Sequence, residues 1–184
     1  TASFSGPQGL AFHDGALYVA DTGNQLIRRV WLPSGNVSTI AGNGQQTYGV
    51  HGTHPARETA LNSPWGLEAV DGYLYIAMAG DHQVWKLDLK RNRIGPFAGS
   101  GAEGIADGTA ARASFAQSSG LAYHAGMLYV ADPESSAVRA ITLENGQVRT
   151  LIGQGLFEFG LRDGPAAHAL LQHDQGLAWL DGKL

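Results

Sequence analysis

The side chains that could bind a ligand or a metal ion are acidic, imidazole and amide groups at or near predicted turns. Carboxylates and imidazoles from several parts of a chain can together hold a calcium or zinc ion, whereas a carboxylate at a strand end can simply accept turn amide hydrogens. We favour the second role for Asp21 and Asp132, since each ends a predicted strand. The candidate binding residues are Asp21, Asn24, His51, His54, Asp81, His82, Asp107, Asp132 and Asp163.

His51 and His54 lie three residues apart in a glycine-containing loop, a spacing that superficially suggests a metal pair. A metal site needs three or four ligands of defined geometry, and no third ligand or rigid scaffold is evident nearby. We therefore interpret the pair as part of a solvated loop and expect no metal or other cofactor. The chain also lacks cysteine, a Gly-x-Ser-x-Gly motif and a Walker-type glycine loop, so no catalytic residue is predicted.

Composition limits the fold and the partners. Of 184 residues, 43% are hydrophobic and 15% charged, which favours a folded domain, and 26 glycines indicate many turns. The net charge of −4 gives no positive field for nucleic acid or an anionic membrane. The longest apolar run, residues 73–79, is far too short to span a bilayer. We expect a soluble protein with no membrane partner, and the charge weighs against nucleic acid as a partner. The compartment stays open, with a slight preference for the cytoplasm.

An internal repeat organises the chain. Gly-Leu pairs begin at Gly9, Gly66, Gly120 and Gly176, at intervals of 57, 54 and 56 residues. An apolar stretch and a tight turn follow each pair. Three of these turns contain Asp-Gly, which is typical of a two-residue hairpin because both central residues need positive φ. The turns are Asp14-Gly15, Asp71-Gly72, Ala125-Gly126 and Asp181-Gly182.

Each complete repeat contains four predicted strands. The second strand, at 17–21, 74–78 and 128–132, is apolar on both faces and must therefore be covered on both sides. Pro96 falls in a fourth strand, which predicts that this strand is the outer one. Four short antiparallel strands per unit, with units packed on one another, describe the blade of a β-propeller, an all-β fold.

The connections between repeats share a pattern of small apolar residues before a bulky one. This pattern predicts one helical turn whose bulky end tucks inward. It occurs at Ala110, Ala113 and Phe115 and again at Ala166, Ala169 and Leu171, with Leu61 as the counterpart in the first repeat.

Chain direction predicts which residues share a face. In a four-stranded meander, the turn between the second and third strands lies at the same end as the connection to the next repeat. This end, which we call the insert-bearing rim, should carry all nine candidate binding residues. Propellers bind ligands at the mouth of the central channel, so the rim is the expected functional face.

Residues 17–30 read Leu-Tyr-Val-Ala-Asp-Thr-Gly-Asn-Gln-Leu-Ile-Arg-Arg-Val and resemble an NHL repeat, with its Tyr-Val-Ala-Asp strand, Gly-Asn turn and Ile-Arg-Val strand. The Asn-Ser-Pro-Trp-Gly-Leu segment at 62–67 is similar to the NHL-repeat-containing protein 2 type, in which a thioredoxin-like domain precedes a six-bladed propeller. Met78 departs from the strand-ending aspartate of the repeat. Without cysteine, no thiol chemistry carries over to this chain.

The resemblance implies that residues 1–184 form a partial NHL propeller of four-stranded antiparallel blades, with repeats at approximately 4–61, 62–116 and 117–172 and the start of a fourth at 173–184. About three blades leave apolar faces uncovered. We therefore expect either a fragment of a six-bladed protein or a homodimer that completes a six-bladed ring.

The implied function is non-catalytic recognition or scaffolding, with a protein or peptide as partner, in what would be the propeller part of a thioredoxin-fused protein. Two alternatives stay open: a propeller hydrolase or lyase with a channel-bound metal, and an RNA-binding NHL domain. The basic residues at 90–93 form one hairpin tip without interleaved aromatic residues, which weighs against RNA.

Overall fold

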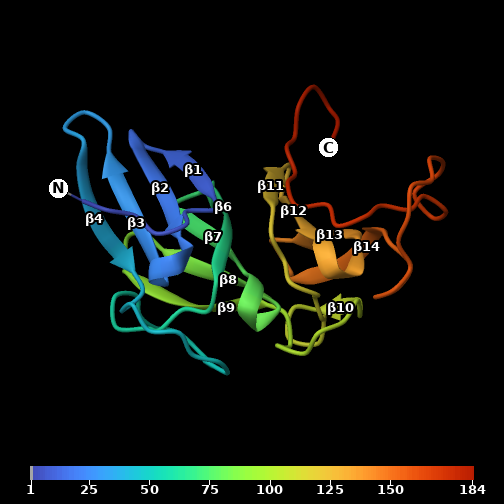
Figure 1. Ribbon diagram of the computed structural model, residues 1–184, viewed down its shortest axis with the longest axis horizontal. Coiled ribbons are helices and arrows are strands. Elements are labelled where there is room, and N and C mark those ends of the chain that lie inside the picture. Colours follow the sequence, from blue (N-terminus) through green and yellow to red (C-terminus); the bar gives the residue numbers. More distant parts are fainter. Residues whose placement is uncertain (1) are drawn as a thin grey trace.

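The computed structural model describes residues 2–184 and is built of three antiparallel sheets (Figure 1). The first sheet has the order β1-β2-β3-β4, and its strands are Leu10–His13, Ala16–Asp21, Leu26–Trp31 and Asn36–Ala41. The second has the order β5-β9-β8-β7-β6, with β5 at His54–Pro55, β6 at Pro64–Val70, β7 at Tyr73–Met78, β8 at Gln83–Asp88 and β9 at Arg93–Ala98. The third has the order β10-β14-β13-β12-β11, with β10 at Gly108–Thr109, β11 at Leu121–His124, β12 at Met127–Asp132, β13 at Ala137–Thr142 and β14 at Gln147–Ile152. The all-β propeller fold is confirmed, whereas the size of a complete ring and the homodimer stay predictions.

The fourth strand of each repeat is the outermost of the four, as Pro96 predicts. In the second and third sheets, however, a two-residue strand from the preceding connection pairs outside it. Strand β5 pairs with β9 only at Ile94 and Arg93, so Pro96 lies beyond this pairing. The prediction that the fourth strand is the outer one therefore holds for the first sheet and is wrong for these two sheets.

The turns follow the repeat. Both central residues of each predicted hairpin have positive φ, as at Asp71 (48°) and Gly72 (78°). After the second strand, each repeat forms a short 3-10 turn: Thr22–Asn24 (η1), Ala79–Asp81 (η2) and Pro133–Ser135 (η3). Each of these turns ends in a left-handed residue, Gln25, His82 and Ser136. The chain thereby reverses direction at the same end of every sheet.

The helical turn predicted in the connections is present. The carbonyl of Thr109 accepts the N–H groups of Arg112 and Ala113 at 2.8 and 2.9 Å, and Pro165 does the same for His168 and Ala169. In the first two connections the bulky residues that follow, Leu61 and Phe115, are completely buried. These two side chains anchor the first two connections to the core, whereas Leu171 in the third is only partly buried.

Burial on both faces of the second strand is also confirmed. On β7, Leu74, Ile76 and Met78 pack in the cluster between the first and second sheets. Tyr75 and Ala77 belong to the cluster between the second and third sheets. None of the helices among residues 2–184 is long and apolar enough to cross a membrane.

Candidate functional site

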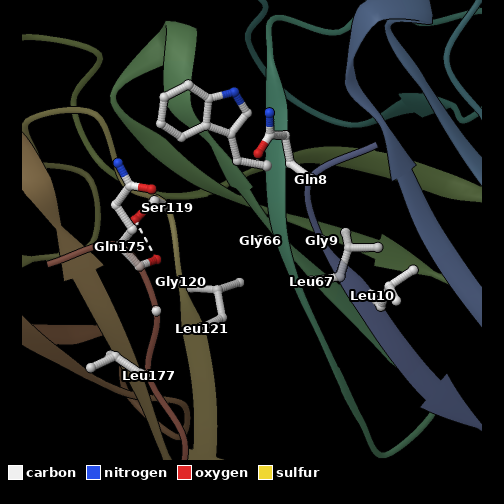
Figure 2. A pocket seen from close by; sticks show the side chains of 12 residues that line it. Gln8, Gly9, Leu10, Gly66, Leu67, Ser119, Gly120, Leu121, Gln175 and Leu177 are labelled. Atoms are coloured by element: carbon white, nitrogen blue, oxygen red, sulfur yellow. Dashed lines mark hydrogen bonds between the residues drawn. The ribbon is translucent and has the colours of Figure 1, made fainter. Parts of the chain in front are cut away.

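Four equivalent tripeptides converge to line a pocket of about 480 Å³, which we call the axial pocket (Figure 2). Three of them begin or precede the inner strands β1, β6 and β11, of which β6 contacts the other two. The fourth follows the connection after β14. The tripeptides are Gln8-Gly9-Leu10, Trp65-Gly66-Leu67, Ser119-Gly120-Leu121 and Gln175-Gly176-Leu177.

Close approach of neighbouring segments explains the central glycines. A Cβ atom at Gly9 would collide with the carbonyl oxygen of Trp65, and one at Gly66 with that of Ser119. At Gly120 the nearest atom, the carbonyl oxygen of Gln175, would lie 2.6 Å away. Each of these three glycines therefore lets one segment rest against the backbone of the next, so their spacing marks the line along which the sheets meet.

The residues before and after each glycine give the pocket two layers. Gln8, Trp65, Ser119 and Gln175 stand directly before the glycines, and a leucine follows each glycine. The Ser119 hydroxyl donates a 2.8 Å hydrogen bond to the carbonyl of Gln175. We call the four residues before the glycines the collar. The collar has no charged side chain and offers amide donors and acceptors beside an indole, which suits a neutral hydrogen-bonding group such as a peptide amide.

Among the predicted site residues, Asp21 and Asn24 form one structural unit in the first sheet. The completely buried Asp21 accepts hydrogen bonds from the Ser5 N–H at 2.7 Å and from the Asn24 amide at 2.9 Å. It also pairs with Arg28 at 3.1 Å. The predicted acceptor role is right, although the donors come from neighbouring segments and side chains as well as from the turn.

Asp132 and Asp107 are joined through Arg139 in the third sheet. The Ala116 N–H lies 2.8 and 2.9 Å from the two oxygens of Asp132, and the Ser135 hydroxyl donates to Oδ2 at 2.8 Å. Arg139 reaches Asp107 at 3.0 Å and Asp132 at 3.8 Å. Burial raises the pKa of Asp132 to about 6, against the opposing effect of these donors and of Arg139. This network ties the connection to its sheet.

In the second sheet, His51, Asp81 and His82 line a second pocket, of about 380 Å³. We call it the rim pocket; its other lining residues are Tyr48, Gly49, Val50, Gly80, Gln83, Ser100 and Gly101. Burial raises the pKa of Asp81. The ring of His82 accepts the Gln117 N–H at Nδ1, 3.1 Å away. The structure thus gathers three of the predicted residues around one hollow.

The remaining predicted residues are on the surface. His54 is exposed, and its Nε2 lies 2.7 Å from the carbonyl oxygen of His51. Asp163 is exposed and lines a separate pocket formed by 160–174. Among residues 2–184, no three His, Cys, Asp or Glu side chains are grouped so that they could share a metal ion. The nine residues therefore divide into several small sets.

The collar residues were missed by sequence reasoning, although their signal was present. Each one immediately precedes a glycine of the Gly-Leu repeat, the most regular feature of the chain. Glutamine, serine and tryptophan at these positions belong to no catalytic or metal-binding motif. The equivalent residue in every repeat of a propeller approaches the axis, so position was a better guide than reactivity.

Comparison with known proteins agrees with the geometry. Residues 4–30 match the family model described as NHL repeat. The chain is 40% identical over 207 residues to NHL repeat-containing protein 2 of Bos taurus, covering 97% of this chain and 28% of that protein. It is also 40% identical over 189 residues to the chloroplastic protein SUPPRESSOR OF QUENCHING 1 of Arabidopsis thaliana, covering 96% and 18%. The chain thus spans less than a third of these relatives.

Solved structures share the fold. A Bacteroides thetaiotaomicron protein of unknown function superposes with a TM-score of 0.75 at 22% identity, covering 96% of this chain and 42% of that one. A chain of a nidogen/laminin complex gives a TM-score of 0.61 at 14% identity, covering 95% and 69%. At these identities the likeness concerns architecture alone.

Proposed function

The chain carries NHL repeats and has the β-propeller fold, and on this premise we propose that it is a non-catalytic module that binds a protein or peptide at its insert-bearing rim. The observation that carries the proposal is the axial pocket with its uncharged collar. Strand direction puts the collar at the end where the connections between repeats enter the sheets. A rigid sheet array that holds variable connections around a hollow is suited to recognition.

The chemistry of the collar supports a peptide as ligand. The side chains of Gln8 and Gln175 are exposed, and each can donate and accept hydrogen bonds in the manner that a peptide amide requires. Trp65 adds a flat apolar surface of the kind enriched at protein interfaces. The leucine layer below can take an apolar side chain.

A peptide-display selection on the purified chain tests this function. We expect the selected peptides to bind the original chain and to lose about tenfold in affinity with Gln175→Ala, a loss typical of one well-placed interface contact. Gln147→Ala is the matched control, because Gln147 is an exposed glutamine on β14, away from the axial pocket. Equal binding by both variants, or a selection that yields no peptide dependent on the collar, would contradict the proposal.

The alternative function is that of a metal-dependent hydrolase or lyase. Metal analysis of protein purified without chelator distinguishes this alternative from peptide recognition. We expect no stoichiometric calcium or zinc, and an ion bound one to one would favour the enzyme. The thioredoxin-like neighbour implied by the sequence resemblance stays a prediction, which the flanking coding sequence decides.

A further inference from the structure

A recurring carboxylate and guanidinium pair at the rim is interrupted in the second sheet. In the first sheet Asp21, which ends its strand, binds the Asn24 amide and pairs with Arg28 at 3.1 Å. In the third sheet the same positions hold Asp132, Ser135 and Arg139, again with hydrogen bonds and an ion pair. Both carboxylates thus have a cation within the chain.

The second sheet keeps the carboxylate and lacks the cation. Its equivalent positions hold Met78, Asp81 and Trp85, so the acid has moved three residues from the strand end into the turn. Trp85 is completely buried, and its Nε1 donates to Gln83 at 2.9 Å. No residue among 2–184 forms an ion pair with Asp81.

One oxygen of Asp81 is also without a hydrogen bond. The Asn62 side-chain amide donates to Oδ1 of Asp81 at 3.1 Å, and the side-chain oxygen of Asn62 accepts a hydrogen bond from the Gln46 side chain at 2.6 Å. Asp81 is only 7% exposed, and its Oδ2 atom is shielded from solvent. This oxygen has no hydrogen-bond partner among the described residues. A buried acceptor of this kind is costly to leave unpaired, and a cationic donor supplies both the charge and the hydrogen bond.

Asp81 is one of the residues that line the rim pocket. No lysine or arginine lines the pocket, and its walls contribute Asp81 with two histidines. Tyr48 stands at the pocket with 73% of its surface exposed, which leaves its ring free to cover a cation. His82 accepts the backbone N–H of Gln117 at Nδ1, so this nitrogen already has a hydrogen-bond partner.

We propose that the rim pocket takes a basic side chain of the bound peptide, arginine by preference, which pairs with Asp81 and so supplies the guanidinium that the first and third sheets provide from within. The inference rests on the proposed function and names a residue that the partner must carry. Arginine is favoured over lysine because its planar fork binds a carboxylate through two parallel hydrogen bonds.

The test uses N-acetyl-arginine amide as the probe and N-acetyl-citrulline amide as its uncharged analogue, titrated into the isotope-labelled chain and followed by NMR. We expect the arginine compound to shift the signals of 48–51 and 80–83, and Asp81→Asn to weaken its binding by about tenfold or more. Asp71→Asn, at an exposed carboxylate in the hairpin between β6 and β7, is the matched control and should bind as the original chain does. A thermal unfolding curve establishes that Asp81→Asn is folded.

The inference is overturned if citrulline binds equally well, if Asp81→Asn binds arginine unchanged, or if arginine causes no shift at these residues. Peptides selected on the chain separate the two proposals. If such peptides depend on Gln175 and bind Asp81→Asn normally, then the propeller recognises peptides at the collar and only the arginine assignment fails.

Discussion

Arg139 and Asp132 form an ion pair across 3.8 Å in which neither side chain is exposed to solvent. Arg139 also donates to the carbonyl of Ser114 at 2.8 Å and to that of Ala106 at 3.0 Å, both in the preceding connection. The pair therefore fastens the connection to the third sheet, and removing one partner leaves a buried charge without compensation.

We expect Arg139→Ala to lower the free energy of unfolding by about 3–5 kcal/mol, the usual cost of breaking a buried pair from one side. Urea denaturation measures the loss. Arg149→Ala is the control, since Arg149 lies exposed on β14, and it should change stability by no more than about 0.5 kcal/mol. Similar losses for the two variants would show that the network does not stabilise the fold.

The central glycine of an axial tripeptide is required where the backbone of the next tripeptide packs directly against it. Gly66→Ala places a methyl group against the carbonyl oxygen of Ser119, so we expect a loss of at least about 2 kcal/mol as backbone shifts apart. Gly176 is the matched control from the fourth tripeptide, because a Cβ there meets nothing within 4 Å. Gly176→Ala should unfold at the same urea concentration as the original chain; an equal loss at both glycines would mean that close approach is not the reason for the repeat.

The acid Asp174 should make stability depend on pH. Burial, aided by the nearby charge of Asp132, raises its pKa to about 6. A raised pKa favours the protonated form in the folded chain, so this contribution is fully present below about pH 4 and is lost as pH rises through 6. Asn mimics the protonated acid, and Asp174→Asn should therefore stabilise the chain at pH 7.5 and have no such effect at pH 4.

After discounting for partial exposure, the expected gain at pH 7.5 is about 1 kcal/mol, or a rise in Tm of about 2–4 °C. Thermal unfolding of both proteins across pH 4–8 measures it. A difference in Tm that is constant with pH would show that the ionisation of Asp174 is not responsible.

The sequence predicts the fold well because the same turn and strand patterns occur in every repeat. The Asp-Gly turns predict positive φ, and the two-sided apolar strand at 74–78 predicts sheets on both of its faces. The outer strands β5 and β10 escape prediction because two residues carry no period. They depend on where the connections fold back, which is a tertiary result.

The site is predicted only in part. Asp21 and Arg28 share the seven-residue spacing of Asp132 and Arg139, so these pairs were open to discovery from sequence. The hollow around Asp81 was not, because its walls join residues from the first connection with the turn of the second sheet. Which acid lacks a cation becomes evident only when the partners of all three repeats are compared in space.

The most direct test of peptide recognition at the rim is hydrogen–deuterium exchange on the chain with and without a saturating selected peptide. Binding at the rim predicts slower exchange in the four axial tripeptides and in 48–51 and 80–83, with the opposite hairpins at 14–15, 71–72 and 125–126 unchanged. Protection confined to those hairpins, or spread over an outer strand edge, would contradict the account.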